Sequence, residues 1–219
     1  MLSGSAARRV VLWRHGRTRW NLEDRFQGHS DVELDETGWA QAERAARLLA
    51  ALNPVTVVSS DLRRARDTAE ALGQVAGVAV QEDPRLRETF AGTWQGLTVA
   101  EIRSTDASAY AAWRTGADVP AGGAETRSDV AARVVPAIVD ALGSVPPGET
   151  LVVVTHGGSA RAAIGSLLGL PMNRWAVIGG LSNCCWSVLE EAVVDAGTGW
   201  RLVEHNAGSL PTPVMGDEE

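Results

Sequence analysis

The chain has 219 residues, of which 45% are hydrophobic and 21% charged, so it is long enough for one large domain or two small ones. Its formal net charge of −7 argues against nucleic acid or an anionic membrane as a general partner. The sequence has no lysine, which excludes a Walker A loop and Schiff-base chemistry. All its basic side chains apart from histidine are arginines, which are best suited to bidentate capture of phosphate or carboxylate.

The first half of the chain alternates short apolar runs with amphipathic stretches. The run over residues 9–13 predicts a buried strand, which ends abruptly in Arg14, His15 and Gly16. We expect Gly16 to let the backbone come close to a ligand. After a polar, turn-rich stretch, the patterns predict a helix over 37–53, a strand over 55–59, a helix over 61–72 and a strand over 78–80, which leads into the loop bearing Glu88.

The second half opens with a broken helical stretch that ends in a loop rich in glycine and proline. Thr126 and Asp129 then form a capping arrangement for a long helix. The patterns predict this helix over 126–142, a strand over 151–155, a helix from 158 to 168, and closing strands over 184–189 and 200–205 with a turn over 195–199 between them.

Strands that alternate with helices imply a mainly parallel sheet in a three-layer α/β/α sandwich. The sequence has no internal repeat and no linker that would divide it, so we expect a single domain over residues 1–219. A small helical cap is expected as an insertion over about 98–125, and a loose acidic tail from about 208.

Three of the predicted strands end in cationic or titratable side chains. The first delivers Arg14 and His15, the second leads to Arg63 and Arg64, and the strand over 151–155 delivers His156. A single charged side chain at the end of one strand could lie at the surface without a functional role. Because the carboxyl ends of parallel strands meet at one edge of a sheet, where ligands collect in open α/β folds, we expect the three to form one anion pocket, with phosphate the natural occupant.

These residues lie within an ordered set of motifs spanning residues 10–158. The motifs are Arg14-His15-Gly16-Arg17-Thr18 with Asn21, Phe26-Gln27-Gly28 with Asp31, Ser59-Ser60-Asp61-Leu62-Arg63-Arg64-Ala65 with Thr68-Ala69, Leu86-Arg87-Glu88 with Gly92, Trp94 and Gly96, and Thr155-His156-Gly157-Gly158. The full set resembles the signature of the histidine phosphatase superfamily, whose fold is phosphoglycerate mutase-like. The resemblance therefore implies that fold and phosphoryl-transfer chemistry.

The resemblance implies a catalytic role for three side chains. His15 is expected to be the nucleophile and to form a phosphohistidine. Glu88 is expected to be the general acid, in the protonated form that a neighbouring phosphate dianion favours. His156 is expected to donate a hydrogen bond to the phosphoryl oxygens as an imidazolium. The alternatives are a surface histidine for His15, a helix N-cap for His156, and a salt bridge of Glu88 with a neighbouring arginine, Arg85 or Arg87.

Arginines and neutral donors complete the expected site. Arg14 and Arg64 are expected to clamp the phosphoryl oxygens, and Arg63 to lie in solvent, because the family pattern places the clamp directly before an alanine. Further substrate contacts are expected from Asn21, Gln27 and Gly157, the last at a helix N-terminus that favours an anion. We expect no metal and no cofactor, because His29 and His205 lack metal-ligand spacing to the other histidines.

We therefore expect a metal-independent phosphatase acting on a small phosphorylated metabolite. Within the family, residues 58–65, 85–89 and 94–98 are similar to actinobacterial glucosyl-3-phosphoglycerate phosphatases, which implies that substrate. One alternative is a cofactor-dependent phosphoglycerate mutase, which would need a longer insertion with more basic residues than Arg103 and Arg114. The other is a catalytically inactive protein that binds a phosphometabolite.

Two further expectations concern the cell compartment and the oligomeric state. The adjacent Cys184 and Cys185 lie in an apolar stretch and are expected to be free, buried thiols. No apolar stretch is long enough for a membrane span and no signal-peptide core follows Met1, so we expect a cytoplasmic protein without a membrane partner. Family precedent and the apolar segment 170–186 suggest a homodimer.

Overall fold

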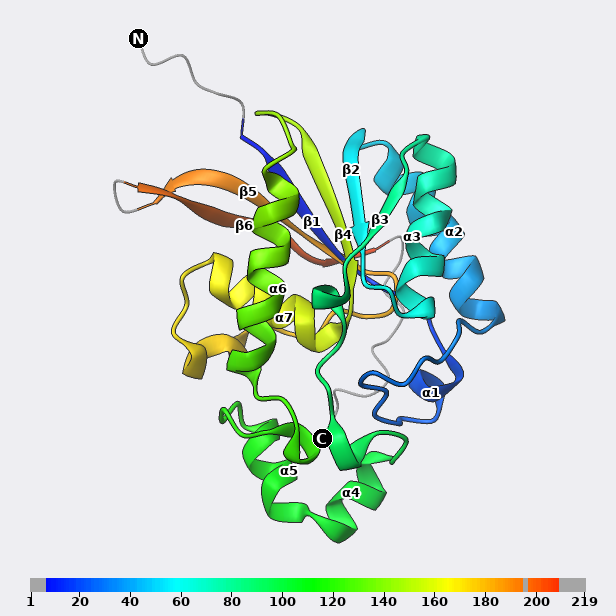
Figure 1. Cartoon of the computed structure of the whole chain (residues 1–219), viewed down its shortest axis with the longest axis vertical. Coiled ribbons are helices and arrows are strands. Elements are labelled where there is room, and N and C mark those ends of the chain that lie inside the picture. Colours follow the sequence, from blue (N-terminus) through cyan, green and yellow to red (C-terminus); the bar gives the residue numbers. More distant parts are fainter. Residues whose placement is uncertain (1–6, 195–196, 209–219) are drawn as a thin grey trace.

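One mixed sheet of six strands forms the centre of the protein, whose computed structural model describes residues 7–194 and 197–208 (Figure 1). The strand order is β3-β2-β4-β1-β5-β6. The first four strands in that order are parallel, and β5 and β6 are antiparallel to their neighbours. The bounds are β1 Arg9–Arg14, β2 Pro54–Ser59, β3 Val80–Glu82, β4 Thr150–Thr155, β5 Trp186–Val194 and β6 Gly197–Ala207.

Helices cover both faces of this sheet and complete the predicted three-layer α/β/α sandwich (Figure 1). The α-helices are α1 Arg19–Leu22, α2 Glu36–Ala50, α3 Arg63–Ala76, α4 Val99–Thr105, α5 Ala107–Arg114, α6 Arg127–Leu142 and α7 Gly157–Leu167. Short 3-10 turns are η1 Pro84–Leu86, η2 Gly92–Trp94, η3 Ala121–Gly123 and η4 Met172–Val177. The fold class expected from the sequence is confirmed.

The alternation of side chains along β1 divides the core in two. Val10 and Leu12 point to the layer formed by α6 and α7, whereas Val11 and Trp13 point to the layer formed by α2 and α3. All six residues of β4 are buried, as expected of a central parallel strand that is covered on both faces. Because both faces of β4 are buried, the register of β1 against β4 is fixed. The positions of the residues that follow the two strands are then fixed as well.

A third hydrophobic cluster forms the cap, which lies at the bottom of Figure 1. It contains α4 and α5, and its buried members are Ala91, Trp94, Ile102, Tyr110 and Ala121. Thr98 begins α4 with a capping box, since its hydroxyl accepts from the Glu101 amide and the Glu101 carboxylate accepts from the Thr98 amide. The cap therefore has its own apolar core and leads directly into α6.

Several predicted boundaries were wrong. The strand expected over 78–80 is β3 at Val80–Glu82, because Gly77 ends α3 in the left-handed region with φ +69° and the chain needs further residues to reach the sheet. The strand expected over 184–189 starts at Trp186 and runs to Val194, because Cys184 adopts φ +57° in a turn. The short helix α1 was not expected.

The turn expected over 195–199 and the tail expected from 208 are only partly visible. β6 already begins at Gly197, so the turn is shorter than expected, and residues 195 and 196 lie outside the described residues. Of the tail, residues 209–219 also lie outside them. The two cysteines are free thiols, Cys184 buried and Cys185 half-buried.

Candidate active site

The ends of β1, β2 and β4 meet at one edge of the sheet. Arg14 pairs in register with Thr155, so His15 and His156 follow adjacent strand ends, and their ring centroids lie 5.1 Å apart. The Ser60 amide donates to the carbonyl of Val154, which brings the start of α3 to the same edge. The structure thus brings together the strand ends that the sequence predicts to converge.

His15 is buried, with 3% of its surface exposed. Its Nδ1 lies 2.7 Å from the carbonyl oxygen of Gly16, which can only accept, so Nδ1 carries the proton and Nε2 keeps a lone pair. Burial lowers the pKa of His15 well below its ordinary value of 6.5, and the positive charges of Arg64 and Arg14 lower it further. The imidazole is therefore neutral at physiological pH, as a nucleophile requires.

Gly16 has a different role from the one expected. A Cβ at this position would lie 2.5 Å from the carbonyl oxygen of Gly38, and a Cβ at Gly38 would lie 2.0 Å from that of Arg17. The two glycines therefore allow the start of α2 to approach the loop after β1 at backbone contact distance. Gly16 permits packing between two backbone segments rather than the approach of a ligand.

Arg64 is fully buried at the start of α3. Its two terminal nitrogens donate to the carbonyl oxygens of Ser30 and Gly28, both at 2.8 Å, and its buried Nε has no hydrogen-bond partner. Burial lowers the pKa of the guanidinium to about 10, so it remains charged at neutral pH. A buried cation held only by carbonyls can recruit an anion at low cost.

The neighbouring arginines differ as the sequence predicts. Arg63 is largely exposed and pairs with Glu33 at 2.7 Å on the surface. Arg14, at the end of β1, donates to the carbonyl oxygen of Leu181 and lines the same cavity as Arg64. Arg14 and Arg64 thus stand on the cavity wall with His15, whereas Arg63 points away.

His156 is the N-cap residue of α7 and is fully buried beside His15. Its Nε2 lies 2.9 Å from the hydroxyl of Ser60, and its buried Nδ1 has no partner. Burial lowers the pKa of His156 well below 6.5, and the positive charges of Arg64, Arg14 and Arg133 lower it further. His156 is therefore neutral in the protein without substrate, and the imidazolium expected beside a phosphoryl group stays a prediction.

The carboxylate of Glu88 lies at the N-terminus of α7. Its Oε2 accepts from the amide of Gly158 at 3.1 Å, and its Oε1 accepts from the amides of Ser159 at 3.2 Å and Thr89 at 2.8 Å. A Cβ at Gly158 would lie 2.5 Å from Oε1, so a larger residue there would displace the Glu88 carboxylate. The alternative salt bridge is absent, because Arg85 pairs with Asp83 and Asp140, and Arg87 pairs with Asp61.

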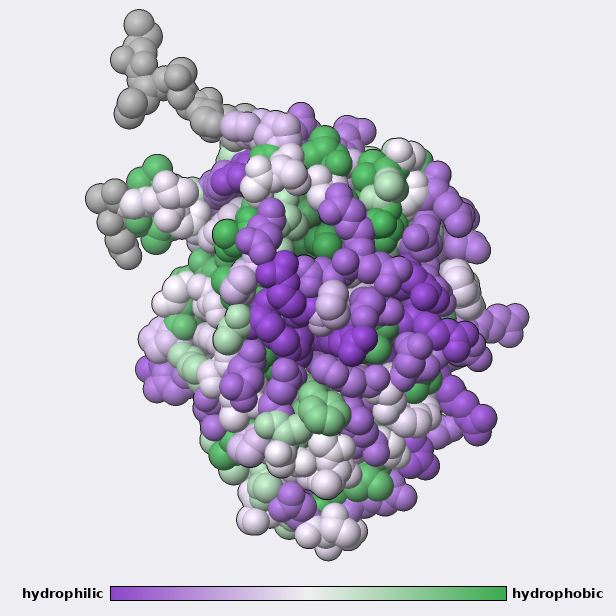
Figure 2. All heavy atoms as spheres, viewed as in Figure 1, coloured by the Kyte–Doolittle hydropathy of each residue, from purple (hydrophilic) through white to green (hydrophobic). Residues whose placement is uncertain are grey.

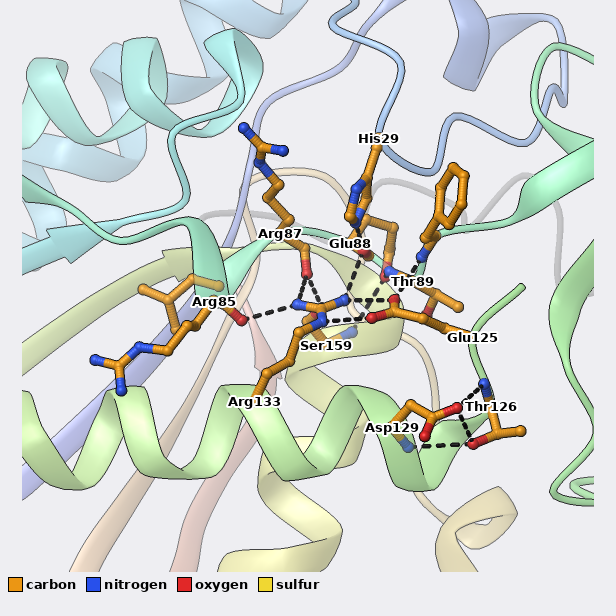
Figure 3. Close-up of polar contacts among 12 residues, drawn as sticks. His29, Arg85, Arg87, Glu88, Thr89, Glu125, Thr126, Asp129, Arg133 and Ser159 are labelled. Atoms are coloured by element: carbon orange, nitrogen blue, oxygen red, sulfur yellow. Dashed lines mark hydrogen bonds and ion pairs between the residues drawn. The ribbon is translucent and has the colours of Figure 1, made fainter.

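Arg133 of α6 holds the loop that carries Glu88 (Figure 3). Its guanidinium donates to the carbonyl oxygens of Arg85, Arg87 and Glu88 at 2.6–2.8 Å, and to both carboxylate oxygens of Glu125 at 2.8 Å. His29 contacts the same Glu88 carbonyl at 2.8 Å through its Nε2. We define these residues, Arg133, Glu125 and His29, as the acid-loop clamp. Sequence reasoning missed it, because His29, the loop of Glu88 and the segment from Glu125 to Arg133 are far apart in the sequence.

The surface over this loop is strongly polar. Hydrophilic side chains gather across the middle of the face shown in Figure 2, between the top of the sheet and the cap. The arginines of the loop are neutralised there by acids on neighbouring elements, as in the pairs Arg85–Asp140 and Arg87–Asp61. Inside the cavity, the buried guanidinium of Arg64 instead donates to the main-chain carbonyl oxygens of Ser30 and Gly28, which leaves its positive charge available to an anion.

The cavity has a volume of about 980 Å³ and extends from His15 to the cap. Gln27 lines it, with a buried Oε1 that has no partner, so its amide can rotate toward a ligand. Asn21 lines it too, but its Oδ1 already accepts from Thr18 and Asn183 in the capping of α1. Gly157 also lines it, and a Cβ at this position would lie 3.8 Å from the Nε of Arg14 and 4.0 Å from the Oε2 of Glu88.

Among residues 7–194 and 197–208, no group of three or more His, Cys, Asp or Glu side chains is arranged to hold a metal ion. No helix in that part of the chain has both the length and the apolar character needed to cross a membrane.

Comparisons with known proteins agree with this geometry. The model of the histidine phosphatase superfamily (branch 1) matches residues 10–207. A glucosyl-3-phosphoglycerate phosphatase of Mycobacterium tuberculosis is 45% identical over 190 residues, covering 84% of this chain and 85% of its own. One of Mycolicibacterium vanbaalenii is 41% identical, covering 92% and 96%. A solved mycobacterial glucosyl-3-phosphoglycerate phosphatase in complex with VO3 superposes with a TM-score of 0.87 at 42% identity, covering 92% and 100%.

Proposed function

The chain belongs to the histidine phosphatase superfamily, and we propose that it is a metal-independent phosphatase that hydrolyses glucosyl-3-phosphoglycerate through phospho-His15. The observation that carries the proposal is a buried, neutral His15 whose Nε2 lone pair shares one cavity with the guanidinium groups of Arg14 and Arg64. A neutral imidazole is the nucleophilic form, and the arginines supply the positive charge that a transferring phosphoryl group requires.

The first transfer forms the phosphoenzyme. The Nε2 lone pair of His15 attacks phosphorus, and the bond from phosphorus to the ester oxygen breaks with its electron pair moving to that oxygen. Glu88 gives its proton to the departing alkoxide, which leaves as an alcohol. Arg14 and Arg64 neutralise charge on the equatorial oxygens, while Nδ1–H of His15 stays bound to the Gly16 carbonyl and delocalises the new positive charge.

The second transfer returns His15 to its starting state. A water molecule takes the place of the alcohol, and the carboxylate of Glu88 removes a proton from it as it attacks phosphorus. The bond from phosphorus to Nε2 breaks with its electron pair returning to the nitrogen, which releases inorganic phosphate. Glu88 is then protonated again, so each turnover consumes one ester and one water and regenerates both residues.

The N-terminus of α7 and His156 support both transfers. The α7 amides and the partial positive charge of the helix face the same space as the phosphoryl group. His156 has a buried Nδ1 without a partner, and a phosphate dianion beside it would favour its protonated, hydrogen-bonding form. The imidazolium role expected for His156 is therefore proposed for the substrate complex alone.

The substrate is tested by steady-state phosphate release from glucosyl-3-phosphoglycerate, 3-phosphoglycerate and simple sugar phosphates. The proposal rests on relatives that are 41–45% identical and bear that substrate's name. We expect the highest kcat/KM for glucosyl-3-phosphoglycerate. A clear preference for another ester would overturn the substrate, and conversion of 3-phosphoglycerate to 2-phosphoglycerate without phosphate release would identify a mutase instead.

We propose a cytoplasmic homodimer. Two free thiols suit a reducing compartment. In the expected interface segment Trp175 is buried, but Val177 is 71% exposed. A groove of about 330 Å³ lined by Leu48, Trp186 and Val203 offers a second apolar surface between α2, β5 and β6. Light scattering after size-exclusion chromatography tests the assembly, and a monomer at every concentration would overturn it. Cell fractionation tests the compartment.

A further inference from the structure

Other arginines line the cavity besides Arg14 and Arg64, among them one on α6 and one on α7. Arg127 is the first residue of α6, and Arg161 lies four residues after Gly157 on α7. Because a helix rises 1.5 Å per residue, Arg161 is about 6 Å along α7 from its N-terminus, where the phosphoryl group is expected. The cavity therefore continues from the phosphoryl site to a second cationic end.

Arg127 is fixed in place. Its terminal nitrogens donate to the carbonyl oxygens of Ala117 at 2.7 Å and Trp113 at 2.6 Å, and its guanidinium lies 5.1 Å from the centre of the Trp113 ring. Burial lowers the pKa of Arg127, and the charge of Arg161 lowers it further. The two cations therefore repel each other across the cavity, a cost that a bound anion would remove.

Carboxylates of the protein do not offset the repulsion between Arg127 and Arg161. Neither Arg127 nor Arg161 forms an ion pair within 4 Å in the part of the chain that the structure describes. Asp118 favours the charge on Arg127 from a distance, but its two oxygens accept from the amide and the hydroxyl of Ser128. The Nε of Arg161 is buried and has no hydrogen-bond partner. Arg161 thus keeps donors for a ligand.

We propose that Arg161, supported by Arg127, binds a carboxylate of the substrate while its phosphoryl group lies against His15. The proposal rests on the proposed function and narrows its substrates to phosphomonoesters with a carboxylate a few bonds from the ester oxygen. Guanidinium and carboxylate form a charge-assisted, bidentate pair, which is strong in a partly desolvated site. The sequence could not reveal the pair, because its members lie on different helices and both face the cavity only in the folded protein.

A matched pair of ligands tests the subsite. 3-Phosphoglycerate carries the carboxylate, whereas glycerol 3-phosphate has a hydroxymethyl group in its place. We expect Arg161→Gln to lower kcat/KM for 3-phosphoglycerate by about tenfold to a hundredfold, mainly through KM, and to change that for glycerol 3-phosphate by less than about twofold. Arg103→Gln removes an exposed charge from α4, outside the cavity wall, and should leave both values unchanged.

Binding measurements separate this proposal from the proposed function. Calorimetric titration in the His15→Ala background, in which turnover is blocked, should show the same selective loss of affinity for 3-phosphoglycerate on Arg161→Gln. An equal loss for both ligands, or equal affinity of the parent for both, would overturn the carboxylate subsite. Failure of the proposed function has a different signature, because the wild type would then release phosphate from neither ester while the binding selectivity remained.

Discussion

At the scale of single residues, His15 and His156 owe their chemistry to the protein around them. Each is buried at a strand end, beside the charges of Arg14 and Arg64. Each therefore has a pKa well below 6.5 and is neutral at physiological pH. The same burial links catalysis to stability, because the unfolded chain binds protons that the folded protein excludes.

The free energy of unfolding should therefore fall as the pH drops below about 6.5. In that range the unfolded state is protonated at both histidines and the folded state is not, so each contributes up to about 1.4 kcal/mol per pH unit. Urea denaturation between pH 7 and pH 5 measures the slope. His15→Gln should reduce this slope by the contribution of one histidine, up to about 1.4 kcal/mol per pH unit. His29 also has a lowered pKa but is present in both proteins, so it cancels. An unchanged slope would show that His15 titrates normally.

Glu88 should be dispensable when the leaving group needs no proton. Glu88→Gln keeps the shape of the side chain and one oxygen that can accept from backbone amides, but it loses the second acceptor oxygen and cannot act as an acid. We expect kcat for an alkyl phosphoester to fall by about 10²–10⁴, and kcat for p-nitrophenyl phosphate, which leaves as a stable anion, to fall much less. Stopped-flow kinetics with both substrates would measure this difference. Equal losses would assign Glu88 a binding role instead of an acid role.

At the scale of elements, α6 holds the main chain of the loop that carries Glu88, and the first amides of α7 donate to the Glu88 carboxylate. The acid-loop clamp ties the main chain at Glu88 to α6 through Arg133, and Glu125 extends the tie to the loop after Glu88 because its carboxylate accepts from the Phe90 amide at 2.7 Å. The Ser159 hydroxyl, on α7, donates to the Arg87 carbonyl at 2.6 Å. The loop is thus held from both helices, and loss of either tie should let the carboxylate move.

Arg133→Gln should reproduce part of the Glu88 defect. The variant loses several charge-assisted bonds to the loop, so kcat for an alkyl phosphoester should fall by about tenfold or more, with a smaller loss for p-nitrophenyl phosphate. Arg85→Gln is the matched control, since Arg85 pairs with Asp83 and Asp140 on the surface and its side chain does not touch Glu88. If Arg133→Gln slowed both substrates equally, the clamp would only stabilise the fold. The fall in the melting temperature of the variant would then measure that stabilisation.

At the scale of the whole molecule, the sequence predicts more of the site than of the element boundaries. The converging strand ends follow from apolar runs that end in Arg14 and His156 or lead shortly to Arg64, which is a pattern of neighbouring residues in the sequence. Boundaries such as that of β3 depend on Gly77 and on how far the chain must travel to the sheet. Contacts between distant segments, such as Arg133 with the acid loop, leave no local pattern at all.

Protonation states also needed the fold. Whether His156 is charged depends on its burial and on the arginines around it, and neither can be read from its neighbours in sequence. The same holds for Gly16, whose requirement comes from the backbone of Gly38 rather than from a ligand. Sequence motifs thus identify which residues act, and tertiary packing decides in which form they act.

The molecule as a whole should work without a metal ion. The proposed chemistry uses imidazole, guanidinium and carboxylate groups, which together supply nucleophile, charge neutralisation and acid. Phosphate release after dialysis against EDTA should therefore equal that of the untreated enzyme, and added Mg²⁺ or Zn²⁺ should not raise it. A stringent metal requirement would replace the phosphohistidine mechanism with a metallophosphatase mechanism.

The central claim is that His15 carries the phosphoryl group between substrate and water. Rapid quench of the enzyme during turnover, under alkaline conditions that preserve phosphoramidates, followed by mass spectrometry of the peptide containing His15, tests it directly. We predict a phosphoryl group on His15 that forms at least as fast as turnover, and in Glu88→Gln its formation from an alkyl ester should be slowed by about 10²–10⁴. Full phosphate release by His15→Ala, or turnover without any phosphorylated His15, would contradict the account.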